Sequence, residues 1–184
     1  RKLLPRLVLL EFPLVIVDDA SPQAVFDQLS ELVNAAAPGS ILVRHTENLG
    51  KGGAVITGLN TANEAGFTHA IQIDADGQHD LGSVARLVDE TTRNPAGIIC
   101  GQPQFDESIS KLRFYSRYIT LVLVRLETLS TEIRDALCGF RSYPLQPVTE
   151  LIKHSKPGKR MAFDPEILVR AVWAGIPLYF VPVK

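Results

Sequence analysis

Two carboxylates and an amide follow an apolar run near the middle of the chain. Ile71-Gln72-Ile73 leads into Asp74, Asp76 and Gln78, which occupy alternate positions. Alternate side chains of an extended chain point to the same side, so these three could converge. Carboxylate and carbonyl oxygens are the hard ligands that Mg²⁺ or Mn²⁺ prefers. The spacing predicts a partial metal site with positions left for water or substrate phosphates; the alternative is a turn that simply ends a strand.

Strand and helix patterns alternate through the first hundred residues. Strands are expected at 14–17, 41–43, 69–73 and 97–101, with helical spacing of apolar residues between them. Near-continuous apolar strands in such an alternation predict a parallel sheet with helices on both faces. Ligands of these sheets bind at the carboxyl ends of the strands. Because Asp18-Asp19 and Asp74-Asp76 both follow strands, we expect them to belong to one site.

The second half of the chain is less regular. A long helix is expected at 111–129, an irregular segment at 134–143, a helix from about 164 to 175 and a final strand at 176–183. The polar stretch at 154–160 contains Pro157-Gly158 and is predicted to be a mobile loop that closes over a ligand. No repeat or linker is visible, so residues 1–184 are expected to form a single domain.

Composition narrows the functional classes. The chain has 184 residues, of which 46% are apolar and 21% charged, as is typical of a soluble globular domain. A net charge of −1 argues against a nucleic-acid partner. Cys100 and Cys138 form neither a disulfide framework nor a zinc-binding spacing. No apolar run is long enough to span a membrane, and a cytoplasmic location is expected.

Five motifs follow one another in an order that points to a known family. They are Val17–Ser21, Asn48–Ala54, Asp74–His79, Asp135–Arg141 and Phe163–Leu168. The chain resembles the family 2 glycosyltransferases with the GT-A fold, especially the branch that looks like dolichyl-phosphate-mannose synthase. The resemblance implies an α/β fold with a Rossmann-like, mostly parallel sheet. It also implies an inverting, metal-dependent hexosyltransferase-like enzyme of cell-envelope glycan or glycolipid biosynthesis.

The resemblance also implies the substrates. The donor would be a nucleoside-diphosphate sugar carrying UDP or GDP, and the acceptor a lipid phosphate or a glycan or other hydroxyl. The residues that would bind the nucleotide sugar are Asp18, Asp19, Lys51, Gly52, Asp74, Arg117 and Arg141. Their types alone leave alternatives open: Lys51 could be solvated in a loop, Arg117 could be an exposed charge, and Arg141 could pair with Asp135.

The metal and the catalytic base follow from the same resemblance. Asp74, Asp76 and Gln78 would hold Mn²⁺ or Mg²⁺ on the diphosphate, and Asp164 would deprotonate the acceptor. A sugar hydroxyl needs such a base, whereas a lipid phosphate does not. Asp164-Pro165-Glu166 is also a good helix start, so a role for Asp164 as helix cap stays open.

The chain departs from the family pattern at its ends. The family begins with a central strand that makes the first nucleotide contacts, whereas residues 1–10 resemble the end of the helix after it. We therefore expect that strand, the C-terminal end and any membrane anchor to lie outside this sequence, with peripheral contact at the inner face of the membrane left open. The Gln-x-x-Arg-Trp motif of processive synthases is absent. Two alternatives remain, a sugar-nucleotide nucleotidyltransferase and a non-catalytic nucleotide-sugar-binding domain.

Overall fold

The computed structural model describes residues 3–104 and 111–183, without the side chains of 111–116. The strands are β1 (Val15–Asp18), β2 (Ile41–Arg44), β3 (His69–Gln72), β4 (Ile98–Pro103), β5 (Arg141–Pro144) and β6 (Leu178–Val183). The helices are α1 (Leu4–Val8), α2 (Gln23–Ala36), α3 (Lys51–Glu64), α4 (Val84–Arg93), α5 (Lys111–Thr128), α6 (Leu145–Ser155) and α7 (Phe163–Trp173), with a 3₁₀ turn at Leu81–Ser83. None of the described helices combines the length and apolar character needed to cross a membrane.

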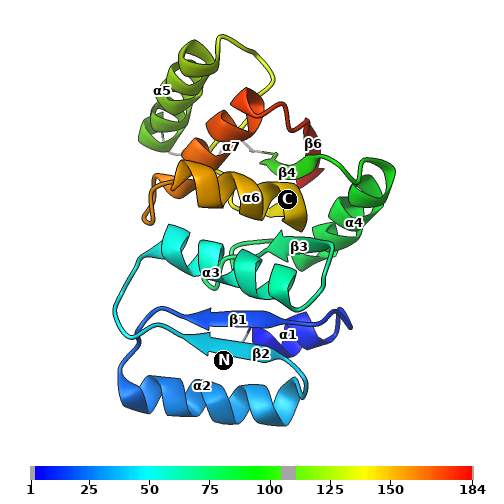
Figure 1. Ribbon diagram of the computed structural model, residues 1–184, viewed down its shortest axis with the longest axis vertical. Coiled ribbons are helices and arrows are strands. Elements are labelled where there is room, and N and C mark those ends of the chain that lie inside the picture. Colours follow the sequence, from blue (N-terminus) through cyan, green and yellow to red (C-terminus); the bar gives the residue numbers. More distant parts are fainter. Residues whose placement is uncertain (1–2, 105–110, 184) are drawn as a thin grey trace.

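The strands form two separate sheets (Figure 1). β1 and β2 pair in parallel, and the four-stranded sheet has the order β3-β5-β4-β6. Within it β4 and β6 are parallel, whereas β5 runs antiparallel to both β3 and β4. The expected α/β architecture with a mostly parallel sheet is confirmed, and β5 is the strand that departs from it.

Helix α3 connects the two sheets. It packs against β1 and β3 and also contacts α6 and α7. Leu59 and Ala62 place its apolar side in the main core, which also contains Phe163 and Ile167 of α7. Because Lys51 is the first residue of α3, this packing also fixes the position of that lysine relative to β3 and α7.

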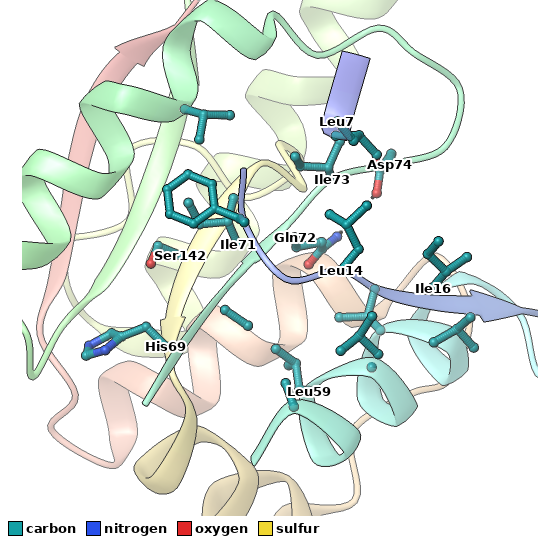
Figure 2. A pocket seen from close by; sticks show the side chains of 18 of the residues that line it. Leu7, Leu14, Ile16, Leu59, His69, Ile71, Gln72, Ile73, Asp74 and Ser142 are labelled. Atoms are coloured by element: carbon teal, nitrogen blue, oxygen red, sulfur yellow. Dashed lines mark hydrogen bonds between the residues drawn. The ribbon is translucent and has the colours of Figure 1, made fainter. Parts of the chain in front are cut away.

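Within the described part of the chain, β1 and β3 each have one edge without a partner strand, and these two edges border one cleft (Figure 2). The cleft has a volume of about 790 Å³, and apolar side chains such as Leu14, Ile16 and Ile71 line much of it. The Leu14 and Asp18 carbonyls accept hydrogen bonds from the chain of β2. Backbone groups alternate along a strand, so those of residues 15 and 17 point away from β2. By the same alternation residues 69 and 71 of β3 point away from β5, since the Thr68 carbonyl accepts from Leu145 on the β5 side.

Gly52 allows a loop to approach α3 closely. A Cβ atom on this residue would lie 2.5 Å from Phe163 Cβ and 2.8 Å from the Gly158 carbonyl oxygen. The Gly53 amide then donates a 2.7 Å hydrogen bond to the Lys159 carbonyl. The loop before α7 is therefore seated directly on the first turn of α3.

Replacing Gly52 with alanine is expected to lower the free energy of unfolding by about 1–3 kcal/mol, because backbone and a core side chain must shift to admit the methyl group. Gly58→Ala in the same helix is the matched control: its Cβ would meet only Val17 Cγ2, at an ordinary 3.5 Å. That variant is expected to be neutral or up to about 1 kcal/mol more stable, because alanine favours helix over glycine. Urea unfolding of both variants measures the difference, and equal stabilities would contradict this account.

Candidate active site

One lysine joins two carboxylates that are far apart in the sequence. The Nζ atom of Lys51 lies 2.7 Å from Asp74 Oδ2 and 2.6 Å from Asp164 Oδ2. Lys51 is the first residue of α3, Asp74 lies two residues beyond β3, and Asp164 is in the first turn of α7. Their side chains are 24%, 23% and 4% exposed. This partial burial makes the ion pairs stronger than surface pairs.

The pKa shifts at this cluster follow from its geometry. Burial alone would lower the pKa of Lys51, but the hydrogen bonds to Asp164 and Asp74 outweigh it and the net shift is upward. Burial alone would raise the pKa of Asp74, but the nearby His79 and Lys51 outweigh it and hold that pKa well below its usual range. Lys51 therefore stays protonated and Asp74 stays ionised at neutral pH.

Asp19 shapes the loop that leads into α3. Its carboxylate accepts the Leu49 amide at 2.8 Å and the Gly50 amide at 2.7 Å. His45 Nδ1 lies 2.8 Å from the same carboxylate, and His45 Nε2 reaches the Thr57 hydroxyl at 2.8 Å. Partial burial would raise the pKa of Asp19, but these hydrogen bonds hold it below its usual value. The neighbouring Asp18 is buried. The expected base and ribose contacts of both residues remain predictions.

The turn after β3 presents the proposed metal ligands. Asp76 and Gln78 are exposed, and Asp76 Oδ1 accepts the Gln78 amide at 2.9 Å, as in a local turn. His79 stacks on Phe140 and places Nε2 3.4 Å from Asp74 Oδ2. No group of three His, Cys, Asp or Glu side chains in the described chain is arranged as a metal site. The ionised Asp74, the exposed Asp76 and the Gln78 amide nevertheless fit a hard divalent cation that keeps open positions.

The two predicted phosphate-binding arginines make internal contacts. Arg117 pairs with Asp135, whose other oxygen accepts the amides of Leu137 and Cys138. Arg141 has no exposed surface; its two Nη atoms donate to two backbone carbonyls and the Tyr143 hydroxyl, while its Nε atom has no partner among the described residues. Asp135 is thus the partner of Arg117, and the alternative pairing with Arg141 is wrong. A phosphate contact by either arginine stays a prediction that this arrangement does not favour.

Asp164 is not a helix cap. Helix α7 starts at Phe163, and the residue before it, Ala162, makes no side-chain capping bond. Asp164 instead directs Oδ2 at Lys51, while its buried Oδ1 has no hydrogen-bond partner among the described residues. A buried carboxylate oxygen without a donor is costly. It is therefore a position where a bound group with a proton to share would be stabilised.

The basic loop before α7 is held at two points. The Lys159 carbonyl accepts the Gly53 amide from α3, and the Gly158 amide donates to Glu166 Oε2 of α7 at 2.7 Å. Lys156 ends α6 in the left-handed conformation, with φ of 47°. The prediction of a mobile loop over the ligand receives no support from these anchors.

Three residues at the site were not singled out from the sequence. Gln72 donates to Asp74 Oδ1 at 3.3 Å, and the Tyr143 hydroxyl donates to Gln72 Oε1 at 3.0 Å. A Cβ on Gly139 would lie 2.7 Å from Lys51 Nζ, so a larger residue there would displace the ammonium from its present position. The available signal was Gln72 itself, a polar residue inside the apolar run of β3.

These features define an α/β protein with acidic residues at the carboxyl ends of its strands, the class that binds ligands at that edge. The profile described as Glycosyl transferase family 2 matches residues 6–151. The chain therefore belongs to glycosyl transferase family 2, as its five motifs predicted.

Two relatives support the expected branch of the family. Polyprenol monophosphomannose synthase of Mycolicibacterium smegmatis is 25% identical over 182 residues, which cover 92% of this chain and 65% of that protein. Undecaprenyl-phosphate mannosyltransferase of Micrococcus luteus is 26% identical over 184 residues, which cover 94% of this chain and 71% of that protein. The chain thus spans about two thirds of the length of each.

Solved structures support the fold. Residues 1–349 of S. aureus TarS superpose with a TM-score of 0.54 at 14% identity, covering 93% of this chain and 49% of that one. A second TarS structure, in complex with UDP, gives 0.52 at 13% identity, covering 95% and 52%. At this identity the likeness concerns the fold alone, and the expected GT-A fold is confirmed.

Lys51→Met should destabilise the fold, because it leaves two partly buried carboxylates without their shared cation. We expect the free energy of unfolding at pH 7 to fall by about 2–4 kcal/mol. In the wild type the lowered pKa of Asp74 gives a stabilisation that is complete above the unfolded-state pKa of about 3.9 and is lost as pH falls through the folded-state pKa. In the variant the folded-state pKa of Asp74 should lie nearer to the unfolded value, so the stability lost as pH falls from about 4 to 2.5 should be smaller than in the wild type.

Urea unfolding from pH 2.5 to 7 measures both effects. Lys153→Met, which removes an exposed lysine from α6, is the control and should change stability by less than about 0.5 kcal/mol. If the two variants gave the same stability and the same pH profile, the bridging role of Lys51 would be wrong.

Proposed function

We propose that the protein transfers a sugar from a nucleoside-diphosphate sugar to a polyprenyl phosphate, with inversion at the anomeric carbon and with a divalent metal ion. The observation that carries the proposal is the cluster of Lys51, Asp74 and Asp164 at the edge of the sheet where strands end. Membership of family 2 and relatives named as acting on polyprenol and undecaprenyl phosphates support it. The choice between UDP and GDP as the nucleotide stays open.

The transfer requires that negative charge be balanced at two places, the leaving diphosphate and the Asp74 carboxylate. The acceptor oxygen forms a bond to the anomeric carbon as the bond to the diphosphate breaks, and the nucleotide leaves with that electron pair. A divalent cation held by Asp74, Asp76 and Gln78 would supply positive charge to the leaving diphosphate. Lys51 fixes the Asp74 carboxylate, and its ammonium limits the negative charge that the donor meets.

The role of Asp164 depends on which class of acceptor the protein uses. With a phosphate acceptor, which is already anionic, its task is to hold Lys51 beside Asp74. With a hydroxyl acceptor, the buried and unpartnered Oδ1 would take the proton. The relatives favour the phosphate. This acceptor sits in a membrane, so the proposal includes peripheral membrane contact, for which the exposed apolar residues Ile119, Leu123 and Leu126 of α5 offer a surface.

Transfer assays on the full-length protein test this function. With Mn²⁺ and polyprenyl phosphate in vesicles, one of the UDP- or GDP-sugars should give a glycosylated lipid phosphate. Asp164→Asn should then lower kcat by less than about tenfold, because no proton must be removed, whereas loss of a general base costs about 10²–10⁴-fold. Glu166→Gln, which removes another carboxylate from the first turn of α7, is the control.

A larger loss in Asp164→Asn than in Glu166→Gln, by about 100-fold or more, would assign Asp164 as base and point to a hydroxyl acceptor. Absence of transfer from every donor to both lipid phosphate and glycan would contradict the proposal. Formation of a sugar nucleotide from a nucleoside triphosphate and a sugar phosphate would instead support a nucleotidyltransferase.

We also propose that a strand of this protein outside residues 1–184 fills the cleft between β1 and β3. The cleft is apolar, yet the backbone groups of Val15, Val17, His69 and Ile71 point toward it from its two sides. Peptide groups beside apolar surface need partners, and a strand between two edges would pair with both. Because α1 leads into β1, a parallel strand before α1 would make an ordinary right-handed crossover.

Amide hydrogen exchange in the full-length protein tests this strand. The amides of Val17 and Ile71 should be as protected as those of Ile16 and Ala70, their neighbours that point toward β2 and β5. Exchange at Val17 and Ile71 faster by roughly 100-fold would show that the two edges stay open. That result would contradict the proposal.

A further inference from the structure

Arg141 is a buried cation, and among the described side chains no carboxylate lies within hydrogen-bond distance of it. It is fully buried on β5, opposite Gln72 of β3. Its Nη1 atom donates to the Asp164 carbonyl at 2.7 Å and its Nη2 atom to the Ala136 carbonyl at 3.0 Å. Nη1 also lies 3.5 Å from the Tyr143 hydroxyl. Burying a guanidinium is costly, so an arginine in this position calls for a reason beyond packing.

The guanidinium sets the direction of a hydrogen-bond chain. Arginine only donates, so the Tyr143 hydroxyl can only accept from Arg141 and must direct its own proton elsewhere. That proton goes to Gln72 Oε1, 3.0 Å away. Burial raises the pKa of Tyr143, so the phenol keeps this proton. With its oxygen occupied, the Gln72 amide can present only its NH₂ group to the other side.

The chain of hydrogen bonds ends at the candidate active site. Gln72 Nε2 donates to Asp74 Oδ1 at 3.3 Å, while Lys51 holds Oδ2 of the same carboxylate at 2.7 Å. Both oxygens of Asp74 are thus engaged, which fixes the plane of the carboxylate. Figure 2 shows Gln72 and Asp74 side by side at the cleft. Ala70, the small residue paired with Tyr143 across the sheet, leaves room for the phenol ring on this face.

We propose that Arg141 is a positioning residue for the Asp74 carboxylate. It acts through two intermediates, the Tyr143 hydroxyl and the Gln72 amide. The same guanidinium holds the backbone of Asp164, so one buried charge sets the place of both aspartates that Lys51 joins. The inference rests on the proposed function, in which Asp74 is a metal ligand. It gives Arg141 a role that needs no contact with phosphate.

Tyr143→Phe tests the chain with the smallest change, because it removes one hydroxyl and keeps the ring. Without the phenolic proton the Gln72 amide is free to turn its oxygen toward Asp74. Partners of metal ligands typically contribute 10–100-fold to metal affinity, so the Kd of the full-length protein for Mn²⁺ should rise by about tenfold. Titration calorimetry with MnCl₂ measures it, without need of an acceptor.

Ser142→Ala is the matched control. It removes a buried hydroxyl from the same strand, but one that accepts from Thr91 on the other side of the sheet. The Kd of this variant for Mn²⁺ should stay within about twofold of the wild type, since the Ser142 hydroxyl is not part of the hydrogen-bond chain from Arg141 to Asp74. Circular dichroism confirms that each variant is folded.

A double-mutant cycle with Gln72→Met tests whether Tyr143 acts through Gln72. In that background Tyr143→Phe should change the Kd by less than about twofold, because the link to Asp74 is already broken. A full effect in the Gln72→Met background, or equal effects of Tyr143→Phe and Ser142→Ala, would overturn the inference.

A second readout keeps this inference separate from the proposed function. In metal-free wild-type protein the Gln72 side-chain NH₂ protons should be protected from solvent exchange in NMR spectra, and Tyr143→Phe but not Ser142→Ala should remove the protection. If the wild type bound no Mn²⁺, the proposed metal dependence would fail while this experiment still decided the positioning role. Unprotected NH₂ protons in the wild type would contradict it.

Discussion

The ammonium group of Lys51 between Asp74 and Asp164 is the contact on which the rest of the site depends. The three residues come from the start of α3, the loop after β3 and the start of α7. Two carboxylates facing one another without a cation would repel and would take up protons. One partly buried lysine offsets this repulsion, and it links the ends of three elements.

Much of the surrounding structure keeps that lysine in place. Asp19 binds the two amides just before it, Gly52 lets the loop before α7 sit on its helix turn, and Gly139 leaves space for its ammonium. From the opposite side the buried Arg141 fixes the backbone of Asp164. A site assembled in this way is rigid before a substrate arrives, which is what electrostatic catalysis of phosphate departure requires.

The sequence predicted the architecture better than the contacts. Strands β1 to β4 and β6 are apolar runs and were recognisable, whereas β5 is Arg-Ser-Tyr-Pro, whose polar residues face a buried network that only the tertiary fold creates. The prediction that Asp74 lies just beyond the carboxyl end of a strand was correct. The partners of Lys51 were not predictable, because Asp164 lies 113 residues away and local spacing says nothing about such a pair.

The contacts of the two arginines were likewise not predictable from the sequence. Arg117 and Arg141 both suggested anion binding, but one pairs with Asp135 and the other serves backbone carbonyls inside the core. Residue type gave the charge of each side chain, while burial decided what that charge does. Gln72 is the opposite case: a polar residue in an apolar strand, which is unusual in the sequence, is buried in the fold and donates a hydrogen bond to Asp74.

The most direct test of the account is the thermal stability of the full-length protein with UDP, GDP and their sugars, in Mn²⁺ or in EDTA. A ligand at 100 times its Kd adds about 2.7 kcal/mol to the free energy of unfolding, which a melting curve resolves readily. We expect a rise in Tm with one nucleotide class that disappears in EDTA. An unchanged Tm with every nucleotide and sugar, in protein shown to be folded, would contradict a donor site at the Lys51 cluster.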